Sequence, residues 1–291
     1  LAIRVTSMTD NGLGLVPLES FHVRTGSYHR PVLVRRPGSI SFLSIHGKIH
    51  YSLINKSQRD RMNQWAVLGT ADIPNNGGQL KLSQRGQDFS IRLSGIRGDL
   101  MNSREHGSEG ALAELGCARL GAIDRACVLV GRLGTGFTLA AALKSLLPSA
   151  QVTVAELIPA VVEWNRGPLG ECAGQPLQDG RTRLYIGDVA QLLTQHSQSF
   201  DAILLDVDNG PEGLTHSENS WLYSVDGLSA IYRSLGPEGT LAIWSAGSDP
   251  LFLIRLKKSG FHAVAQTVRA RPGKGSRHTI FLAQKGRAMA T

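Results

Sequence analysis

Apolar residues follow two alternating patterns from about residue 126 to the end of the chain. Short apolar runs predict strands, and stretches in which apolar residues recur every three or four positions predict helices. The predicted strands cover residues 127–130, 151–156, 182–186, 202–206 and 239–244, and the predicted helices cover 137–146, 159–166, 189–195, 223–234 and 250–258. This alternation is typical of a doubly wound, mostly parallel sheet with helices on both faces.

The segments that flank this pattern predict antiparallel strands. Residues 261–270 and 277–284 are two alternating runs around the turn sequence RPGKGS, which predicts a C-terminal hairpin. Residues 79–101 hold the runs LKL and FSIRL between turn residues, which predicts a small β unit. Residues 108–121 predict a helix with Ser108 as its N-cap. The expected fold class is therefore a Rossmann-like α/β domain preceded by a small β unit.

The first 61 residues are patterned less clearly than the rest. Residues 32–34 and 40–54 alternate in places, but no ordered series of caps and turns accompanies them. We therefore divide the chain into a basic head of residues 1–61, a β unit of residues 62–107 and a Rossmann-like domain of residues 108–291. We expect the head to be disordered or absent from the native protein. If it is absent, the native protein starts at Met62, and the intact mass of the natively expressed protein tests this expectation.

The composition is that of a folded protein. The 291-residue chain (31.3 kDa) is 42% hydrophobic and 19% charged, which supports a sizeable core and excludes global disorder. No apolar run approaches the roughly 20 residues of a membrane helix. Because Cys117, Cys127 and Cys172 have neither CxxC spacing nor an even count, neither a disulfide framework nor a zinc site is expected. With no secretory signal in the first residues, we expect a cytoplasmic protein without a bound metal.

The net charge of +8 raises the question of nucleic-acid binding. Nine cationic and three anionic side chains lie in residues 1–61, so this head carries +6 of that charge and the remaining chain only +2. A nearly neutral body with a basic head is not the pattern of a groove-binding protein. We therefore expect neither nucleic acid nor a membrane as a partner.

A glycine-rich turn follows the first strand of the α/β pattern. In VLVGRLGTGF, residues 128–137, a buried strand runs into Gly131, Gly134 and Gly136 and then into a helix. Such glycines let the backbone approach a ligand closely and leave helix N–H groups pointing at it. Glu156 ends the next strand, 20 positions beyond Gly136, where an acid accepts both hydroxyls of a ribose. Together they predict a nucleoside site. Taken separately, each has a plainer alternative: tight packing for the glycines, and an exposed carboxylate at a strand end for Glu156.

Two further strands end in acids. Gly187 and Asp188 follow the third strand, where Asp188 accepts from an adenine amino group, caps the next helix, or does both. Asp206 ends the fourth strand, and Asp208 and Asn209 follow in a turn. Two carboxylates at the mouth of a pocket suit a cationic amine, which one binds while the other takes its proton. Asp208 and Asn209 are alternatively ordinary turn residues.

Histidines and tryptophans add weaker candidates. The candidate acid–base histidines, which we expect to be ordinary surface residues instead, are His106, His216 and His278. Three tryptophans have two possible roles, which are contact with an adenine or an amine and packing in the core: Trp164, Trp221 and Trp244.

The ordered set of glycine loop, Glu156, Asp188 and Asp206 resembles the spermidine synthase family of the class I S-adenosylmethionine methyltransferase superfamily. The resemblance covers residues 79–284 and is carried by the motifs VLVGRLGTGFTL, VAELIPAVVEWNR, YIGDVAQLL and FDAILLDVDNGPEGL. It implies a cofactor site made by Gly131, Gly134, Thr135, Gly136, Glu156, Gly187 and Asp188, with Glu156 on ribose and Asp188 on adenine. It further implies Asp206 as catalytic proton acceptor and a substrate site made by Asp208, Asn209 and Glu109.

The resemblance implies aminopropyl transfer from decarboxylated S-adenosylmethionine to a putrescine-like amine, by a protein that associates as a homodimer through its β unit. Thr135 stands where the family has an Asp that holds the aminopropyl amine, which keeps methyl transfer from S-adenosylmethionine as an alternative. Gly107 and Ser108 replace two residues of a Tyr-His-Glu segment, of which only Glu109 matches. A catalytically silent nucleoside- or polyamine-binding protein and an NAD-dependent dehydrogenase are further alternatives.

Overall fold

The computed structural model of the chain describes residues 64–74, 77–206, 219–271 and 273–286, and the backbone of four strands nearer the N-terminus. The chain forms two compact units, Leu1–Trp65 and Ala66–Thr291. In the first unit two antiparallel pairs form, namely β1 (Thr6–Thr9) with β2 (Gly12–Leu15) and β3 (Val32–Arg36) with β4 (Ser39–Leu43). Met62, the expected native start, lies outside the described residues.

The second unit is built on a seven-stranded sheet with the order β11-β10-β9-β12-β13-β15-β14. The parallel strands are β9 (Cys127–Val130), β10 (Gln151–Glu156), β11 (Thr182–Ile186), β12 (Phe200–Leu205) and β13 (Leu235–Ser245). The antiparallel hairpin at one edge consists of β14 (Phe261–Arg271) and β15 (Lys274–Lys285). The expected mostly parallel sheet with a C-terminal hairpin is therefore confirmed.

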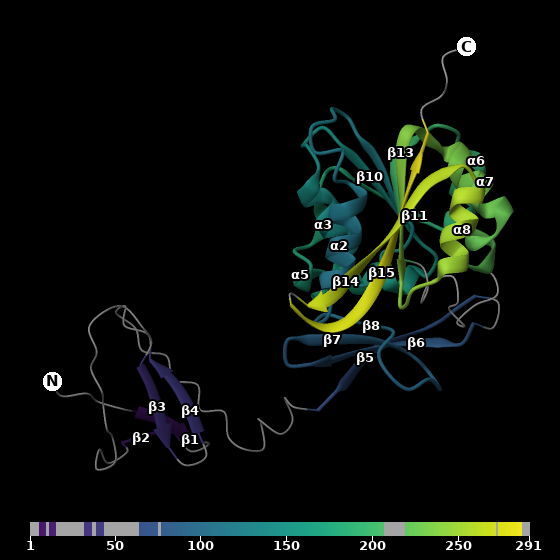
Figure 1. The fold of residues 1–291 in the computed structure, drawn as a ribbon. Helices are drawn as coiled ribbons and strands as arrows, with labels where there is room; N and C mark the ends of the chain where they lie inside the picture. Colours follow the sequence, from purple (N-terminus) through teal and green to yellow (C-terminus); the bar gives the residue numbers. More distant parts are fainter. Residues whose placement is uncertain are drawn as a thin grey trace. The chain divides into compact units, whose positions relative to one another are not determined.

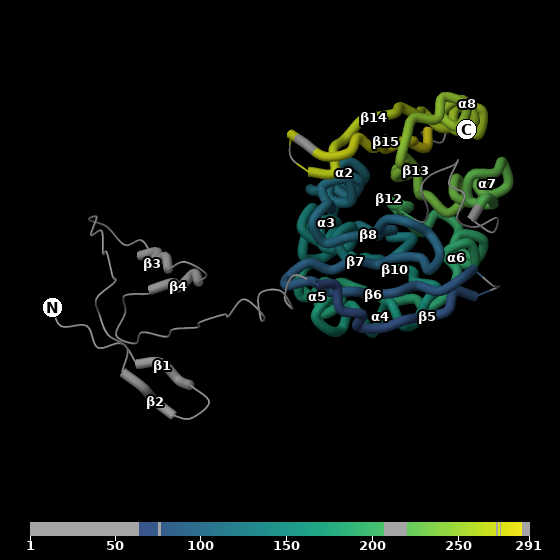
Figure 2. The backbone as a smooth tube through the Cα atoms, turned by 90° about the horizontal axis from the view of Figure 1, so that it is seen from below, coloured from purple at the N-terminus to yellow at the C-terminus, as the bar shows by residue number. Residues whose placement is uncertain are grey.

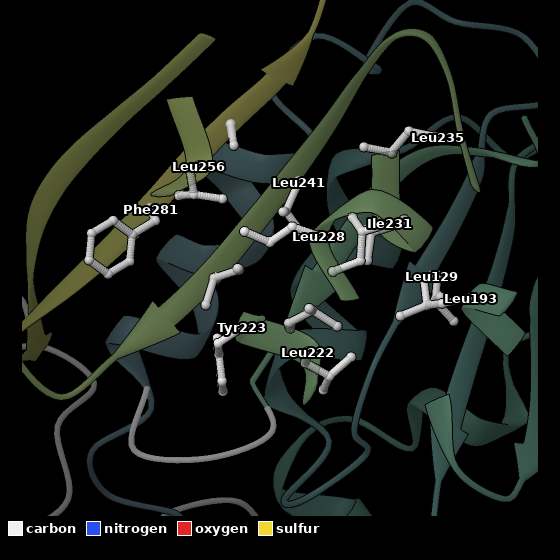
Figure 3. Close-up of a cluster of buried hydrophobic side chains, with 14 of the residues drawn as sticks. Leu129, Leu193, Leu222, Tyr223, Leu228, Ile231, Leu235, Leu241, Leu256 and Phe281 are labelled. Atoms are coloured by element: carbon white, nitrogen blue, oxygen red, sulfur yellow. The ribbon is translucent and has the colours of Figure 1, made fainter. Parts of the chain in front are cut away.

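Helices cover both faces of this sheet (Figure 1). They are α2 (Gly107–Gly116), α3 (Phe137–Ser145), α4 (Pro159–Arg166), α5 (Pro168–Cys172), α6 (Val189–Gln195), α7 (Val225–Ser234) and α8 (Pro250–Lys258), with single turns η1 (Pro176–Gln178) and η2 (Asn219–Tyr223). One buried cluster joins the sheet to α6, α7 and α8, and Figure 3 shows Leu228, Ile231 and Leu256 of these helices with Leu241 and Phe281 of the strands. A second cluster joins the opposite face to α2 and α3.

Side chains at the helix starts explain the first residues of α7 and α8. Ser224 Oγ accepts from Gly227 N at 3.1 Å, and Asp249 Oδ1 accepts from Phe252 N at 2.8 Å, so α7 and α8 begin at the next residue in each case. The prediction that Ser108 caps α2 is wrong. The Ser108 hydroxyl donates to Glu109 Oε2 at 2.8 Å instead, and the helix already begins at Gly107.

A four-stranded antiparallel sheet forms the predicted β unit, with the strands β5 (Ala66–Asp72), β6 (Gln79–Arg85), β7 (Asp88–Leu93) and β8 (Met101–Asn102). Leu80 and Ile91 of this sheet are buried against Val161 of α4 and Leu169 of α5. Figures 1 and 2 show the sheet across one end of the α/β layer. Since Met101 reaches Gly134, just beyond β9, that end is the one at which the parallel strands terminate.

Candidate functional site

The glycine loop joins β9 to α3 by a tight turn. Gly131 N donates to Leu204 O at 2.8 Å, which extends the β9–β12 pairing, and Gly136 N donates to Leu133 O at 2.8 Å. Gly134 (φ +53°) and Gly136 (φ +85°) adopt left-handed conformations that favour glycine. A Cβ at Gly134 would lie 2.7 Å from Met101 Sδ, so a side chain there would have to displace that of Met101. The predicted strand–turn–helix context of the loop is confirmed.

Glu156 holds this loop in place. Its carboxylate is only 3% exposed; Oε2 accepts from Leu133 N at 3.2 Å and from Gly134 N at 3.4 Å, and Oε1 accepts from Ile158 N at 2.9 Å. The structure therefore brings the acid and the glycine loop together, as their spacing predicts. A carboxylate oxygen has two lone pairs, so Oε1 keeps acceptor capacity for a ligand hydroxyl.

Asn165 is a loop contact that the sequence analysis missed. From α4 its Nδ2 donates to Gly134 O at 2.8 Å and to Val161 O at 2.9 Å, and its side chain is fully buried. Its Oδ1 has no hydrogen-bond partner in the described part of the chain. The available signal was a polar residue four positions after Val161, on the buried face of an amphipathic helix.

Apolar side chains lie exposed beside these acids. Leu157 follows β10 and is 42% exposed, and Ile186 ends β11 and is 52% exposed. Glu156 and Ile186 are register partners, so the two apolar side chains come from neighbouring strand ends. Asp188 follows them and caps α6, accepting from Ala190 N at 2.8 Å, which confirms the capping alternative. An apolar surface next to polar acceptors has the chemistry that a purine nucleoside needs.

Asp206 follows β12 directly, and its charge acts on the carboxyl of Glu109. Burial raises the pKa of Asp206 above its ordinary value, and the positive charge of Arg132 opposes that rise. Glu109, in the first turn of α2, has its pKa raised from 4.5 to about 7 by burial and then by the negative charge of Asp206, against the hydrogen bond from Ser108. The site thus holds two carboxyls whose negative charges act on each other.

The remaining candidate residues from the sequence lie in different surroundings. Thr135 is buried in the glycine loop, 3% exposed. Asp208, Asn209 and His216 lie outside the described residues. The expectation that His278 is an ordinary surface residue is wrong: its ring lies 4.7 Å from that of Trp244, and burial lowers its pKa.

Two searches for other site types found nothing in the described part of the chain. No group of three or more His, Cys, Asp or Glu side chains is arranged to hold a metal ion there. In the same residues, no helix combines the length and the apolar character needed to cross a membrane.

Comparison with solved structures identifies the fold. The match to a spermidine synthase in complex with the transition state analogue AdoDATO covers 82% of this chain and 76% of that protein, at 17% identity and a TM-score of 0.59. Spermidine synthase from Thermotoga maritima matches 76% of this chain and 73% of its own, at 18% identity and a TM-score of 0.59. The match to a probable spermidine synthase from Corynebacterium glutamicum covers 76% of this chain and 80% of that protein, at 16% identity and a TM-score of 0.51.

Comparison at the sequence level gives no family. No protein-family model matches the chain, and no curated protein matches it either. The chain has a spermidine synthase-like fold of the class I S-adenosylmethionine methyltransferase type, and its activity is a separate question.

Proposed function

We propose that the protein is a transferase that binds an S-adenosyl nucleoside and moves a carbon group from its sulfonium to an amine. One observation carries this proposal: the glycine loop tied to Glu156 and the half-buried carboxyls of Asp206 and Glu109 lie at the same edge of the sheet. The first feature suits a nucleoside and the second suits a cationic amine.

The nucleoside would be held by residues of three strand ends. The glycine loop offers backbone close to the ligand, Glu156 accepts from ribose hydroxyls, and Asp188 accepts from the adenine amino group. The exposed side chains of Leu157 and Ile186 supply apolar contact for the purine. The neighbouring solved structure that carries AdoDATO supports a ligand of this class.

Asp206 would act as proton acceptor. An ammonium has no lone pair, so the acceptor amine must lose a proton before its nitrogen attacks. The sulfonium supplies a carbon already activated for displacement. The ammonium first gives a proton to Asp206. As the nitrogen–carbon bond then forms, the carbon–sulfur bond breaks and its electrons stay on sulfur. Glu109, whose pKa is near 7, keeps the charge of the pair matched to a single cation.

Aminopropyl transfer is the first candidate reaction, because two acids beside the loop suit a polyamine and its donor. Methyl transfer is the second candidate, and it is favoured by Thr135 and Arg132. Thr135 supplies no charge to hold an ammonium in the loop, and the Arg132 cation acts on the adjacent Asp206. A cation there suits the carboxylate that S-adenosylmethionine retains and its decarboxylated form lacks.

Calorimetric titration of the full chain with S-adenosylmethionine, its decarboxylated form and NAD tests the proposal. We expect one S-adenosyl compound to bind, and its identity selects between methyl and aminopropyl transfer. Glu156→Ala should abolish binding, whereas Asp206→Asn should preserve binding and lower turnover by roughly 10²- to 10⁴-fold. Asp226→Asn, an exposed acid in the first turn of α7, is the matched control.

Three results would contradict the proposal in different ways. Binding of NAD alone would indicate a dehydrogenase. Nucleoside binding with no product from any amine would indicate a silent binding protein. Loss of binding and turnover together in Asp206→Asn would argue against a separate role in proton transfer.

A further inference from the structure

Three buried donor atoms on β13, β14 and β15 have no hydrogen-bond partner among the described residues. They are Trp244 Nε1, Arg271 Nε and His278 Nδ1. The indole and guanidinium nitrogens can only donate, and the imidazole nitrogen donates in one of its tautomers. Buried polar atoms are nearly always paired, so several unpaired donors call for a partner that the described residues do not supply.

These donors lie together at the end of the antiparallel hairpin. The Trp244 and His278 rings are 4.7 Å apart, and Trp244 is the register partner of Ile280, two residues from His278. Arg271 ends β14 and forms an ion pair with Glu105 at 3.0 Å through Nη2, which leaves Nε available. The charge of Glu105 also acts on His278, so one acid links the arginine to the histidine.

The donors share a sheet face and a sheet edge with the carboxyl pair. Leu204, Ala242 and Ile280 point into the same buried cluster beneath α2. Two residues farther along their strands, toward the same edge, come Asp206, Trp244 and His278 respectively. Because side chains alternate between the faces of a sheet, these three lie on the α2 side as well.

Helix α2 packs over this group of side chains. Gly116 of α2 lies so close to Leu204 and Ala242 that no Cβ would fit, and Gly107 lies against the backbone of Ala270. The first turn of the helix therefore reaches the end of β14, next to Arg271. Glu109 in that turn is influenced by the charges of both Asp206 and Glu105, which places the acids and the donors in one electrostatic group.

The two halves of this group have opposite preferences. Asp206 and Glu109 suit a cationic amine, whereas Trp244, Arg271 and His278 need a hydrogen-bond acceptor, and a guanidinium favours a carboxylate. A simple diamine carries donors at both ends and no acceptor once it is protonated. It would satisfy the acids and leave the three donors unpaired.

Building on the proposed function, we propose that the acceptor substrate is an amino acid with a side-chain amine rather than a diamine. Its amine lies at Asp206 and Glu109, and its carboxylate lies toward Arg271, Trp244 and His278.

Ornithine and putrescine test this directly, because they differ only by the α-carboxylate. Calorimetry on the full chain, first with each probe alone and then with the bound S-adenosyl nucleoside, should show at least roughly tenfold tighter binding of ornithine, about 1.4 kcal/mol. Lysine and cadaverine form a second matched pair with the same expected order. With turnover followed by mass spectrometry, the kcat/KM ratio of the two probes should show the same preference.

Two variants connect the preference to the donors. Trp244→Phe removes Nε1 but keeps an aromatic ring, and Arg271→Lys keeps the charge opposite Glu105 but removes Nε. Each should reduce the ornithine preference severalfold through KM while putrescine binding stays the same. Arg277→Lys, an exposed change on the same hairpin, is the control. If one variant does not fold, as judged by circular dichroism, the other still gives the answer.

Equal affinity for the two probes, or tighter binding of putrescine, would overturn the inference. An unchanged preference in both variants would do so as well, since buried water rather than substrate would then satisfy the donors. Because the probes are also titrated alone, failure of nucleoside binding would count against the proposed function and leave the probe preference measurable.

Discussion

Asn165→Asp is the variant that best tests how the glycine loop is held. The change is nearly isosteric, but it replaces a nitrogen that donates to Gly134 O at 2.8 Å and to Val161 O at 2.9 Å with an oxygen. The side chain is fully buried, and its Oδ1 has no hydrogen-bond donor beside it in the described part of the chain. The new carboxyl therefore faces two carbonyl oxygens and is stable only when protonated.

The expected magnitude follows from these contacts. The protonated acid still donates one hydrogen bond, so the variant loses about 1 kcal/mol of stability at low pH. The ionised acid is an uncompensated buried charge, which costs roughly 3–5 kcal/mol. The folded-state pKa of the acid then lies above its unfolded value of about 3.9, so stability is highest below that value and falls as pH rises through the folded-state pKa. Between pH 5 and pH 8 we expect the variant to lose roughly 1–3 kcal/mol relative to the native chain.

Urea unfolding at pH 5, 6, 7 and 8 measures this difference, with the native chain and Asn165→Leu as references. Asn165→Leu loses the same donor but has nothing to titrate, so its difference from the native chain should not change with pH. Nucleoside binding should weaken in both variants, because Gly134 loses its tether. A pH-independent deficit in Asn165→Asp would refute the reasoning, since the side-chain nitrogen would then not face the two carbonyls.

Three further predictions concern the loop, the carboxyl pair and the thiols. Thr135→Asp should shift binding toward decarboxylated S-adenosylmethionine, measured as the ratio of the two dissociation constants; an unchanged ratio would mean that this position does not contact the ligand tail. Glu109→Gln removes a group whose pKa is raised from 4.5 to about 7, so the native chain should lose up to roughly 3 kcal/mol more stability than the variant as pH rises from 4.5 through 7; thermal unfolding at pH 5 and 8 compares the two. Cys172 is exposed, whereas burial raises the pKa of Cys117 to about 12, so a thiol reagent should modify Cys172 first and reach Cys117 only on unfolding, as peptide mass mapping would show.

The fold of the α/β domain was largely predictable from local pattern. The bounds of β9, β10 and β11 agree with the predicted strands, and those of α4, α6 and α8 with the predicted helices. These elements are short, strongly periodic and bounded by Gly, Pro or Asp, so local sequence and burial favour the same structure. The predicted start of α2 was wrong because Glu109 takes the Ser108 hydroxyl, which is a side-chain contact within the candidate site.

The meeting of the glycine loop with Glu156, where we propose that the nucleoside binds, was also predictable, because these residues follow a sequence rule. Parallel strands end at one edge, so acids that follow successive strands must gather there. Leu133 and Gly134 of the glycine loop meet Glu156 for this reason, although they precede it by 23 and 22 positions.

The other half of the site depends on tertiary structure. His278 comes from an antiparallel hairpin, Trp244 from the end of β13, and Arg271 from the end of β14, and nothing in their spacing relates them to Glu109 on α2. The packing of α2 over the sheet brings them together, and burial then raises the pKa of Glu109 and leaves donors unpaired. Sequence determined which strand ends carry chemistry, whereas desolvation and contact between distant segments, which only the packed fold creates, decided what those groups can bind.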